Sequence, residues 1–221
     1  MSATIAPAAA DTPIPTTRFD WKPVGLLVAL MALAFPAVGS AGSWLTLTVA
    51  GLAMGMIFFV AASGLTLVFG LMDVLNFGHG VFIALGAFVA TSVMGGLAGW
   101  GAGSASASLA AVGCAMLAAM AVAGALGWAF ERVIIRPVYG LHLKQILITM
   151  GGMIVGEELI KAIWGPGQIA LPLPDALRGA FIVGDAAIEK YRLLAAAVGL
   201  AVFALLLWTL NRTKKIGRAH V

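Results

Sequence analysis

The chain alternates between long apolar stretches and short polar connections. Six stretches carry few charges, and most approach the roughly 20 residues that an α-helix needs to cross the hydrocarbon core of a bilayer. The sequence therefore predicts an all-α fold, a polytopic transmembrane helical bundle with about six membrane segments. These segments are Val24–Val38, Trp44–Met72, Val81–Leu97, Leu109–Phe130, Gln145–Trp164 and Leu193–Leu210.

The second segment is too long for one upright crossing. As a helix its roughly 29 residues would extend about 43 Å, against about 30 Å of hydrocarbon. Tilt can absorb part of the excess. We expect a break near Ser63–Gly64 or near Gly70 to absorb the rest, so at least this segment is predicted to be discontinuous.

Composition supports a membrane protein. Hydrophobic residues make up 62% of the 221 residues and charged residues only 10%, which is more apolar surface than a soluble domain of this size can bury. The formal net charge of +4 gathers in particular connections, so it indicates topology and not binding to nucleic acid. Cys114 is the one cysteine, which excludes an intrachain disulfide or a cysteine metal cluster.

The basic residues follow alternate connections. They are Arg18 and Lys22 before the first segment, Arg132, Arg136 and Lys144 between the fourth and fifth, and Arg212, Lys214, Lys215 and Arg218 after the sixth. Because basic residues concentrate in cytoplasmic loops, both termini are predicted to be cytoplasmic in a multi-pass protein of the bacterial inner membrane. The connections at residues 39–43, 95–108 and 165–192 then face the opposite side.

Three regions follow from this pattern. Residues 1–23 form a disordered cytoplasmic tail rich in Pro, Ala and Thr, residues 24–210 the transmembrane domain, and residues 211–221 a basic cytoplasmic stub. The first segment, with Pro36 and the small residues after it, also has features of a cleaved signal peptide, but the region before it is unusually long for one.

Asp73, Asn76 and His79 lie between two apolar segments, where polar groups are costly in lipid. Their spacing of three would place them on one broad helical face, although Gly78 and Gly80 favour a turn or a helix start there. These residues are candidates to line a translocation path. They could equally lie at the cytoplasmic interface, and for His79 a structural hydrogen bond is favoured over a metal ligand, since no ligand partner stands at suitable spacing.

Glu157, Glu158 and Lys161 form a second polar group, inside the fifth segment. A carboxylate here could meet the ammonium of a substrate in an outer vestibule, and all three are candidates for the path. An intrahelical pair of Glu157 with Lys161 at i,i+4, reaching to the interface, is the favoured interpretation.

Two further features are interpreted as packing or connection. The Gly51–Gly55 and Gly152–Gly156 pairs have the spacing of close helix contacts. The segment Gly165–Arg192 carries three prolines, so it is partly rigid. It could receive an extracytoplasmic partner or act as a simple lid or connector.

The sequence lacks the signature motifs of several functional classes. There is no phosphate-binding G-x-x-x-x-G-K-[ST] loop, no H-E-x-x-H zinc motif and no regular arginine series of a voltage sensor. We therefore expect no catalytic residue, no metal and no cofactor in this chain. An intramembrane serine hydrolase using Ser63 and His79 is a weaker alternative, because Ser before Gly in an apolar helix usually serves packing.

Three ordered blocks resemble the permease subunits of branched-chain amino acid ABC importers. They are residues 64–80, residues 131–165 from Glu131-Arg-Val-Ile-Ile-Arg-Pro137 onward, and residues 191–219. The positions matching the signature are Gly64, Asn76, Gly78, His79 and Gly80 in the first block and Glu131, Arg136 and Pro137 in the second.

The resemblance implies a permease domain that carries Leu, Ile or Val and uses no ATP itself. Its implied partners are a sister permease, two cytoplasmic ATPase subunits and a periplasmic substrate-binding protein. Urea and short-amide importers share this kind of permease, and an ion-driven carrier or channel remains an alternative. In the family a basic stretch like residues 212–219 leads into a loop that docks the ATPase, so we expect a truncated reading frame that gives no uptake by itself.

Overall fold

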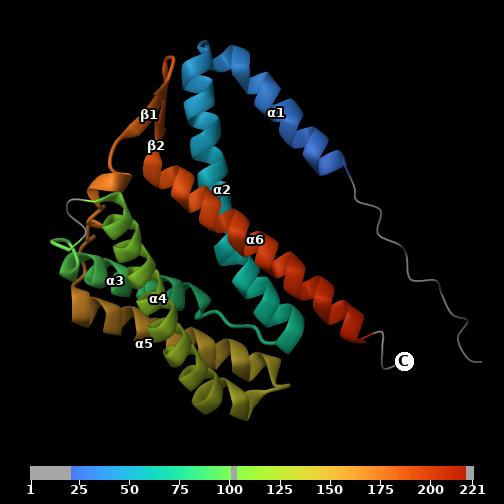
Figure 1. Cartoon of the computed structure of the whole chain (residues 1–221). Helices are drawn as coiled ribbons and strands as arrows, with labels where there is room; N and C mark the ends of the chain where they lie inside the picture. Colours follow the sequence, from blue (N-terminus) through green and yellow to red (C-terminus); the bar gives the residue numbers. More distant parts are fainter. Residues whose placement is uncertain (1–20, 101–103, 218–221) are drawn as a thin grey trace, which may run out of the picture.

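The computed structural model describes residues 21–100 and 104–217. Most of the predicted tail and residues 218–221 of the predicted stub lie outside the described residues. Six α-helices account for most of the described chain, and a small hairpin precedes the last helix (Figure 1). The helices are α1 Lys22–Val38, α2 Ala41–Met72, α3 His79–Gly96, α4 Ala105–Phe130, α5 His142–Trp164 and α6 Lys190–Gly217. The predicted all-α membrane bundle is confirmed.

The short connecting elements lie at the two ends of the bundle. A π-helical stretch, Glu131–Ile135, and a 3₁₀ turn, Arg136–Val138, continue α4 toward α5. A 3₁₀ turn at Asp175–Leu177 and two antiparallel strands, β1 Ala180–Val183 and β2 Ala186–Glu189, lie between α5 and α6. The hairpin was not predicted, because four-residue strands give little periodic signal.

Local sequence explains several helix ends. The Ser40 hydroxyl accepts a hydrogen bond from the Ser43 amide at 3.2 Å, and the Ser104 hydroxyl accepts one from the Ala107 amide at 3.1 Å, so both serines are N-caps. Gly39 ends α1 with φ = +76°, a conformation that glycine adopts without a Cβ penalty.

The break predicted inside the second segment is wrong. α2 is continuous over 32 residues, and the hydroxyl of Ser63 donates to the Val60 carbonyl at 2.9 Å without interrupting it. Its excess length lies partly beside the hairpin, since the Thr46 hydroxyl accepts a hydrogen bond from the Ala187 amide at 3.1 Å. The interruption in the backbone comes after Met72 instead.

α2 and α6 form one packed unit. Their backbones approach closely at Gly199, where an added Cβ would lie 2.6 Å from the Met56 Cβ. The rings of Phe59 and Phe203 meet edge to face at 5.4 Å between centroids. α1 lies against the first turns of α2, where the Trp44 indole donates to the Met31 carbonyl at 2.9 Å.

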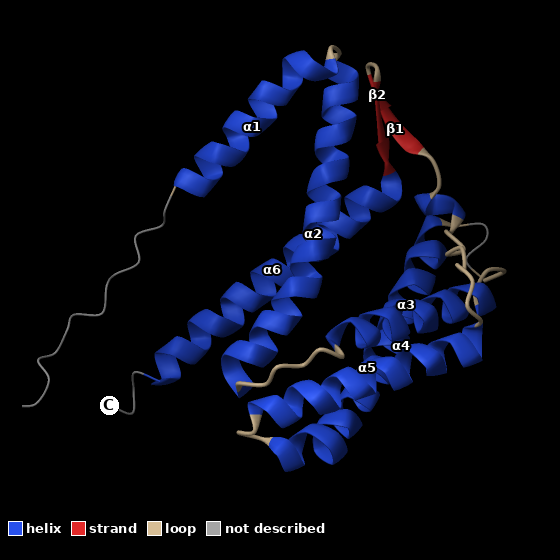
Figure 2. Ribbon diagram, turned by 180° about the vertical axis from the view of Figure 1, so that it is seen from behind, coloured by secondary structure: helices blue, strands red, loops and turns tan. Residues whose placement is uncertain are grey.

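α3, α4 and α5 form a second unit, separate from the α2–α6 pair in both views (Figures 1 and 2). α3 packs mainly on α4, with Met94, Ala111 and Ala115 buried between them. α5 crosses beside both, and its Trp164 indole donates to the Ser92 hydroxyl of α3 at 2.8 Å. The chain passes between the two units through residues 73–78 and again through residues 165–189.

The two predicted glycine motifs behave differently. An added Cβ at Gly152 would lie 2.6 Å from the Phe130 ring, and one at Gly156 would lie 2.5 Å from Val81 Cγ1, so this motif packs α5 against its neighbours. No heavy atom of another described element lies within 4 Å of a Cβ at Gly51 or Gly55. Within the described chain, the packing interpretation of the Gly51–Gly55 pair is therefore wrong.

Four stretches of the described chain are long and apolar enough to cross a membrane: 41–71, 79–96, 105–138 and 190–210. α1 is helical but has only 17 residues. Every 18-residue stretch of α5 contains at least three of its four charged residues, which are Lys144, Glu157, Glu158 and Lys161. Large apolar side chains cover the outer surface, as expected of a protein solvated by lipid.

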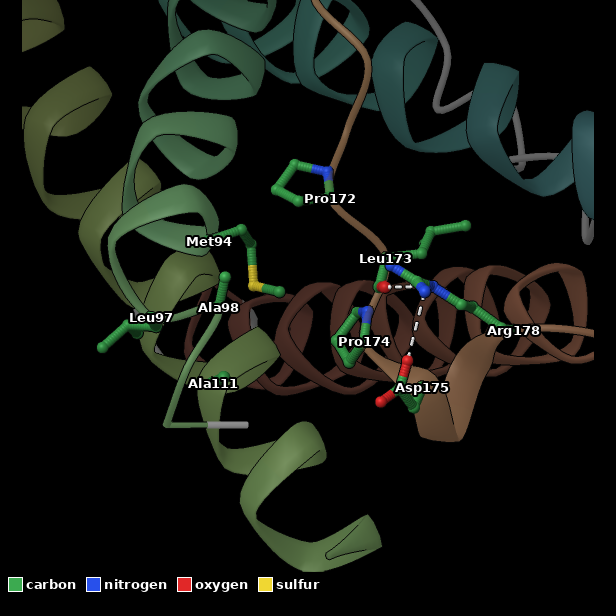
Figure 3. Close-up of a pocket in the computed structure, with 9 residues that line it drawn as sticks. All are labelled: Met94, Leu97, Ala98, Ala111, Pro172, Leu173, Pro174, Asp175 and Arg178. Atoms are coloured by element: carbon green, nitrogen blue, oxygen red, sulfur yellow. Dashed lines mark hydrogen bonds and ion pairs between the residues drawn. The ribbon is translucent and has the colours of Figure 1, made fainter. Parts of the chain in front are cut away.

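The long connection before α6 folds against the ends of α3 and α4. Figure 3 shows Pro172, Pro174 and their neighbours facing Met94 and Ala111 across a small cavity of about 70 Å³. Arg178 stiffens the turn, because its guanidinium donates to the Leu173 carbonyl at 2.9 Å and pairs with Asp175 at 3.2 Å. The segment is therefore packed onto the bundle over these residues.

Candidate functional site

The backbone leaves helical geometry between α2 and α3. Asp73 caps α2 in the left-handed region with φ = +52°, and its amide donates to the Phe69 carbonyl at 3.0 Å. Gly78 then caps α3, which begins at His79. We call residues 73–78 the α2–α3 linker. The helix start predicted around Gly78 is confirmed.

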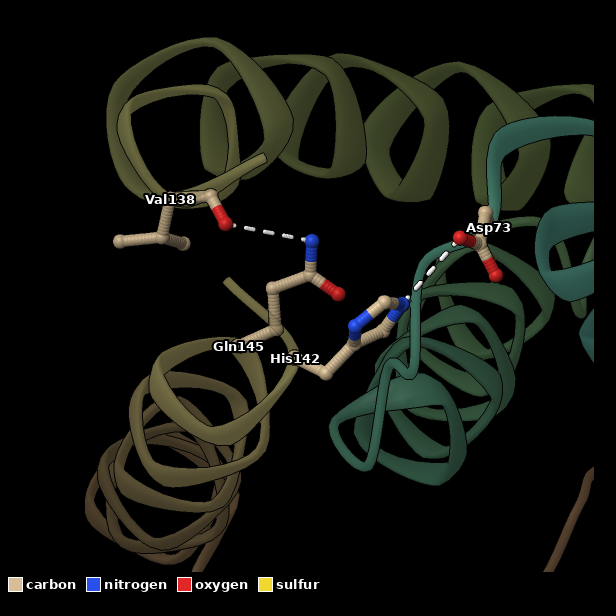
Figure 4. A network of polar contacts seen from close by, with 4 residues as sticks. All are labelled: Asp73, Val138, His142 and Gln145. Atoms are coloured by element: carbon tan, nitrogen blue, oxygen red, sulfur yellow. Dashed lines mark hydrogen bonds and ion pairs between the residues drawn. The ribbon is translucent and has the colours of Figure 1, made fainter. Parts of the chain in front are cut away.

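The three polar residues of this region do not share one face. The Asp73 carboxylate lies 3.1 Å from the His142 Nε2 of α5 (Figure 4). The Asn76 Oδ1 accepts from the Gly78 amide at 3.0 Å, and His79 Nε2 lies 3.1 Å from the Ala61 carbonyl of α2. The single polar face expected for a continuous helix is therefore not formed, because the linker is not helical between Asp73 and His79.

The contact of His79 with Ala61 settles the tautomer of the imidazole. A carbonyl oxygen only accepts, so Nε2 must carry a proton and donate to it. The ring is then held against α2, and a Cβ added at Gly64 would lie 3.0 Å from its Cε1. The absence of a side chain at Gly64 thus leaves room for the His79 ring to approach α2.

Gly78 and Gly80 differ in what surrounds them. A Cβ at Gly78 would lie 3.2 Å from Asn76 Oδ1 and 3.5 Å from the Thr149 carbonyl, so this glycine admits both the Asn76 turn and α5. No atom of another described element lies within 4 Å of a Cβ at Gly80. Packing within this chain explains the glycine at 78 and not the one at 80.

A hollow of about 470 Å³ opens beside the linker. Asn76, His79 and Thr66 are its polar side chains, and the walls are otherwise apolar. Its lining residues are Leu65, Thr66, Phe69, Val74, Leu75, Asn76, Phe77, His79 and Gly80. Asp73 does not line this hollow. The sequence analysis missed Thr66, because only folding brings that turn of α2 beside the linker.

α5 presents a polar stripe to the linker that the sequence analysis also missed. His142, Gln145 and Thr149 recur at intervals of three and four, which places them along one face of a helix. Gln145 and Thr149 are 1% and 0% exposed. The sequence did contain a signal for this stripe, namely two polar residues within an apolar segment. Such residues need hydrogen-bond partners when they are buried.

The contacts of the stripe reach two parts of the chain. The Gln145 Nε2 donates to the Val138 carbonyl at 3.2 Å (Figure 4). The Thr149 hydroxyl donates to the Gln145 carbonyl at 2.7 Å and accepts from the Phe77 amide at 3.3 Å. The same hydroxyl lies 3.3 Å from the Leu75 carbonyl.

The second polar group lies near the other end of α5, about 24 Å along the axis from His142 at 1.5 Å per residue. Lys161 pairs with Glu158 at 2.8 Å, at i,i+3. The predicted pairing with Glu157 at i,i+4 is therefore wrong, although an intrahelical pair does form. The structure does not bring Glu157, Glu158 or Lys161 to the hollow beside the linker.

The second signature block forms the turn that follows α4. Tyr139 donates to the Glu131 carboxylate at 2.6 Å across this turn. That hydrogen bond raises the pKa of the Tyr139 phenol above its ordinary value, and burial adds to the effect. Arg136 and Pro137 form the 3₁₀ turn between them, and proline is tolerated in such a first turn.

The geometry does not form the nucleophile and base of a serine hydrolase. The Ser63 hydroxyl donates to Val60, and the Nε2 of His79 donates to Ala61, so neither side chain contacts the other. Among the described residues, no group of three His, Cys, Asp or Glu side chains is placed to hold a metal ion. Cys114 is exposed on α4.

Comparisons with known proteins identify similar sequences. The family profile described as branched-chain amino acid transport system / permease component matches residues 47–220. The high-affinity branched-chain amino acid transport system permease protein LivH is 30% identical over 136 residues in Salmonella typhimurium and over 135 residues in Escherichia coli, covering 61% of this chain and 42% of the relative. BraD, the corresponding permease protein of Pseudomonas aeruginosa, is 29% identical over 140 residues, or 63% of this chain and 44% of BraD. The chain thus spans about two fifths of the length of these relatives. No solved structure matches the chain significantly.

Proposed function

Since the chain belongs to the family of branched-chain amino acid transport permease components, we propose that it forms part of the membrane path of an ATP-driven importer for Leu, Ile and Val. The observation that carries this proposal is the hollow beside the α2–α3 linker. There the backbone leaves helical geometry between two apolar helices, and polar groups stand next to apolar walls.

The lining of the hollow suits an aliphatic amino acid. Such a substrate has an apolar side chain that gains by contact with Leu65, Phe69 and Val74, and polar groups that need hydrogen-bond partners. Asn76 and His79 line the same hollow and can provide partners as the substrate passes. The apolar walls favour such a passenger over urea or short amides.

The energy for transport would come from other subunits, because this chain has no phosphate-binding loop. We propose cytoplasmic ATPase subunits, a sister permease and a substrate-binding protein outside the membrane as partners. The basic residues of the α4–α5 turn and of the end of α6 would face the cytoplasm. The hairpin and the Pro172–Arg178 turn would face the binding protein.

Uptake of labelled leucine by the assembled transporter tests the role of the hollow. We expect Asn76→Leu and His79→Leu to lower uptake about tenfold, the effect of losing one or two polar contacts, with membrane abundance unchanged. Gln168→Leu, an exposed residue of the outer connection, is the matched control. Normal uptake in both linker variants would contradict the proposal.

A second arm tests the energy source. Inactivating the ATPase partner should abolish leucine uptake by the same cells. Uptake that continues and follows an ion gradient would instead indicate an ion-driven carrier. This arm does not depend on the residues of the hollow, so it separates the class of transporter from the location of its path.

A further inference from the structure

We propose that the polar stripe of α5, formed by His142, Gln145 and Thr149, is a latch that positions the α2–α3 linker during transport. The inference rests on the proposed function, because the linker carries Asn76 and His79 into the hollow. The stripe lines none of the walls of that hollow. Its three residues would act through the linker as positioning residues.

Thr149 is the centre of this latch. Its hydroxyl has one proton and accepts from the Phe77 amide at 3.3 Å. The proton can go to the Gln145 carbonyl at 2.7 Å or the Ile146 carbonyl at 3.2 Å, both within α5, or to the Leu75 carbonyl at 3.3 Å, in the linker. The shorter distance favours the bond within α5. A small shift of the linker toward α5 would exchange an acceptor within α5 for the Leu75 carbonyl.

Of the other two residues, His142 contacts the first residue of the linker, and Gln145 contacts the turn after α4. The pair between His142 and Asp73 fixes the residue that ends α2 with φ = +52°, the one non-glycine residue with positive φ among those described. The Gln145 amide ties α5 to Val138, while its Oε1 is buried with no hydrogen-bond partner among the described residues. In Figure 4 this oxygen is turned to the side of His142.

Two features distinguish a latch from a fixed support: the unpaired acceptor Oε1 of Gln145 and the hydroxyl proton of Thr149, which has more than one acceptor within reach. A buried acceptor without a partner carries an energetic cost that a purely structural contact would avoid. The α2–α6 pair and the α3–α4–α5 unit are joined by the linker and by residues 165–189, and relative movement of these units would displace the linker.

Cysteine labelling of the linker tests the latch in the assembled transporter. The parent carries Cys114→Ser and the reporter Phe77→Cys, whose native side chain is 52% exposed. We expect Thr149→Val to raise the rate of labelling by a small maleimide about fivefold, as for the loss of one net hydrogen bond. Thr149→Ser, which keeps the hydroxyl, should return the rate to within about twofold of the parent.

Two further variants complete the design. Thr91→Val on α3 removes a hydroxyl that donates to the Ala87 carbonyl at 2.8 Å within the same helix, so it is the matched control and should leave the rate unchanged. His142→Leu removes the pair with Asp73 at a half-exposed position, where folding is not at risk. His142→Leu should raise the rate of maleimide labelling, so the latch can be tested even if the Thr149→Val protein does not fold.

The outcomes separate the latch from the proposed function. Faster labelling together with reduced leucine uptake, both rescued by Thr149→Ser, supports the latch. Parent labelling rates in His142→Leu and in any folded Thr149→Val protein overturn it, and so does faster labelling with normal uptake. Labelling needs no substrate, and leucine uptake is measured in chains that keep Phe77, because this residue lines the hollow. The absence of leucine uptake in the chain without substitutions would therefore contradict only the proposed function.

Discussion

Replacing Gly156 by alanine should destabilise the α3–α5 contact. The added Cβ would lie 2.5 Å from Val81 Cγ1 and 3.6 Å from Val81 Cβ. Carbon atoms pack best at about 3.5–4.0 Å, so α3 or α5 must move by about 1 Å to admit the methyl group. Valine in a helix has one strongly preferred rotamer, so its side chain cannot simply turn away.

Two opposing free energies set the magnitude. Overpacking a close contact lowers stability by about 1–3 kcal/mol, while replacing glycine by alanine within a helix raises stability by about 1 kcal/mol. The expected net change for Gly156→Ala is therefore a loss of about 0–2 kcal/mol. Gly151, five residues earlier in α5, has no described neighbour within 4 Å of an added Cβ, so Gly151→Ala should gain about 1 kcal/mol of stability.

The free energy of unfolding in mixed detergent micelles measures this difference. The two alanine variants should differ by about 1–3 kcal/mol, with Gly156→Ala the less stable. Adding Val81→Ala to Gly156→Ala should remove most of the penalty, because the two methyl groups then no longer compete for one space. Equal stability of the two glycine variants, or no relief in the double variant, would refute the packing argument.

Two other changes probe the site and the α4–α5 turn. Gly64→Ala should lower leucine uptake severalfold, because its Cβ would lie 3.0 Å from the His79 ring; Gly70→Ala, with open space around its Cβ, should leave uptake unchanged. The raised pKa of Tyr139 means that the folded state holds the phenol proton more tightly than the unfolded state. Its contribution to stability is present below pH about 10 and is lost as the pH rises through the higher folded pKa, so unfolding midpoints in strong alkali should fall more steeply for the native chain than for Tyr139→Phe. Parallel pH profiles would contradict the role of the Glu131 hydrogen bond.

The helices themselves could be predicted from the sequence. A backbone in lipid must satisfy its hydrogen bonds internally, so each long apolar stretch has one available structure. Glycine at positions 78 and 80 also located the start of α3. The predicted break inside α2 failed because Ser63 and Thr66 satisfy their hydroxyls on the preceding turn, at 2.9 Å each, and the helix continues.

Sequence spacing alone could not give the contacts between helices. The Gly51 and Gly152 motifs have the same spacing, yet only the second meets a neighbouring helix. The partners of Asp73 and His79 lie 69 and 18 residues away along the chain. An interval of three predicts a shared face only while the helix is continuous, and it ends at Asp73.

The sequence by itself determined that this protein is a bundle of membrane helices with a polar interruption near residue 76, because the bilayer permits few backbone structures. Only the tertiary structure decided which side chains meet at that interruption. It brought α5 to the linker and turned Asp73 away from the hollow that Asn76 and His79 line. Such contacts depend on how apolar helices pack, and many faces of an apolar helix are nearly equivalent until their neighbours are in place.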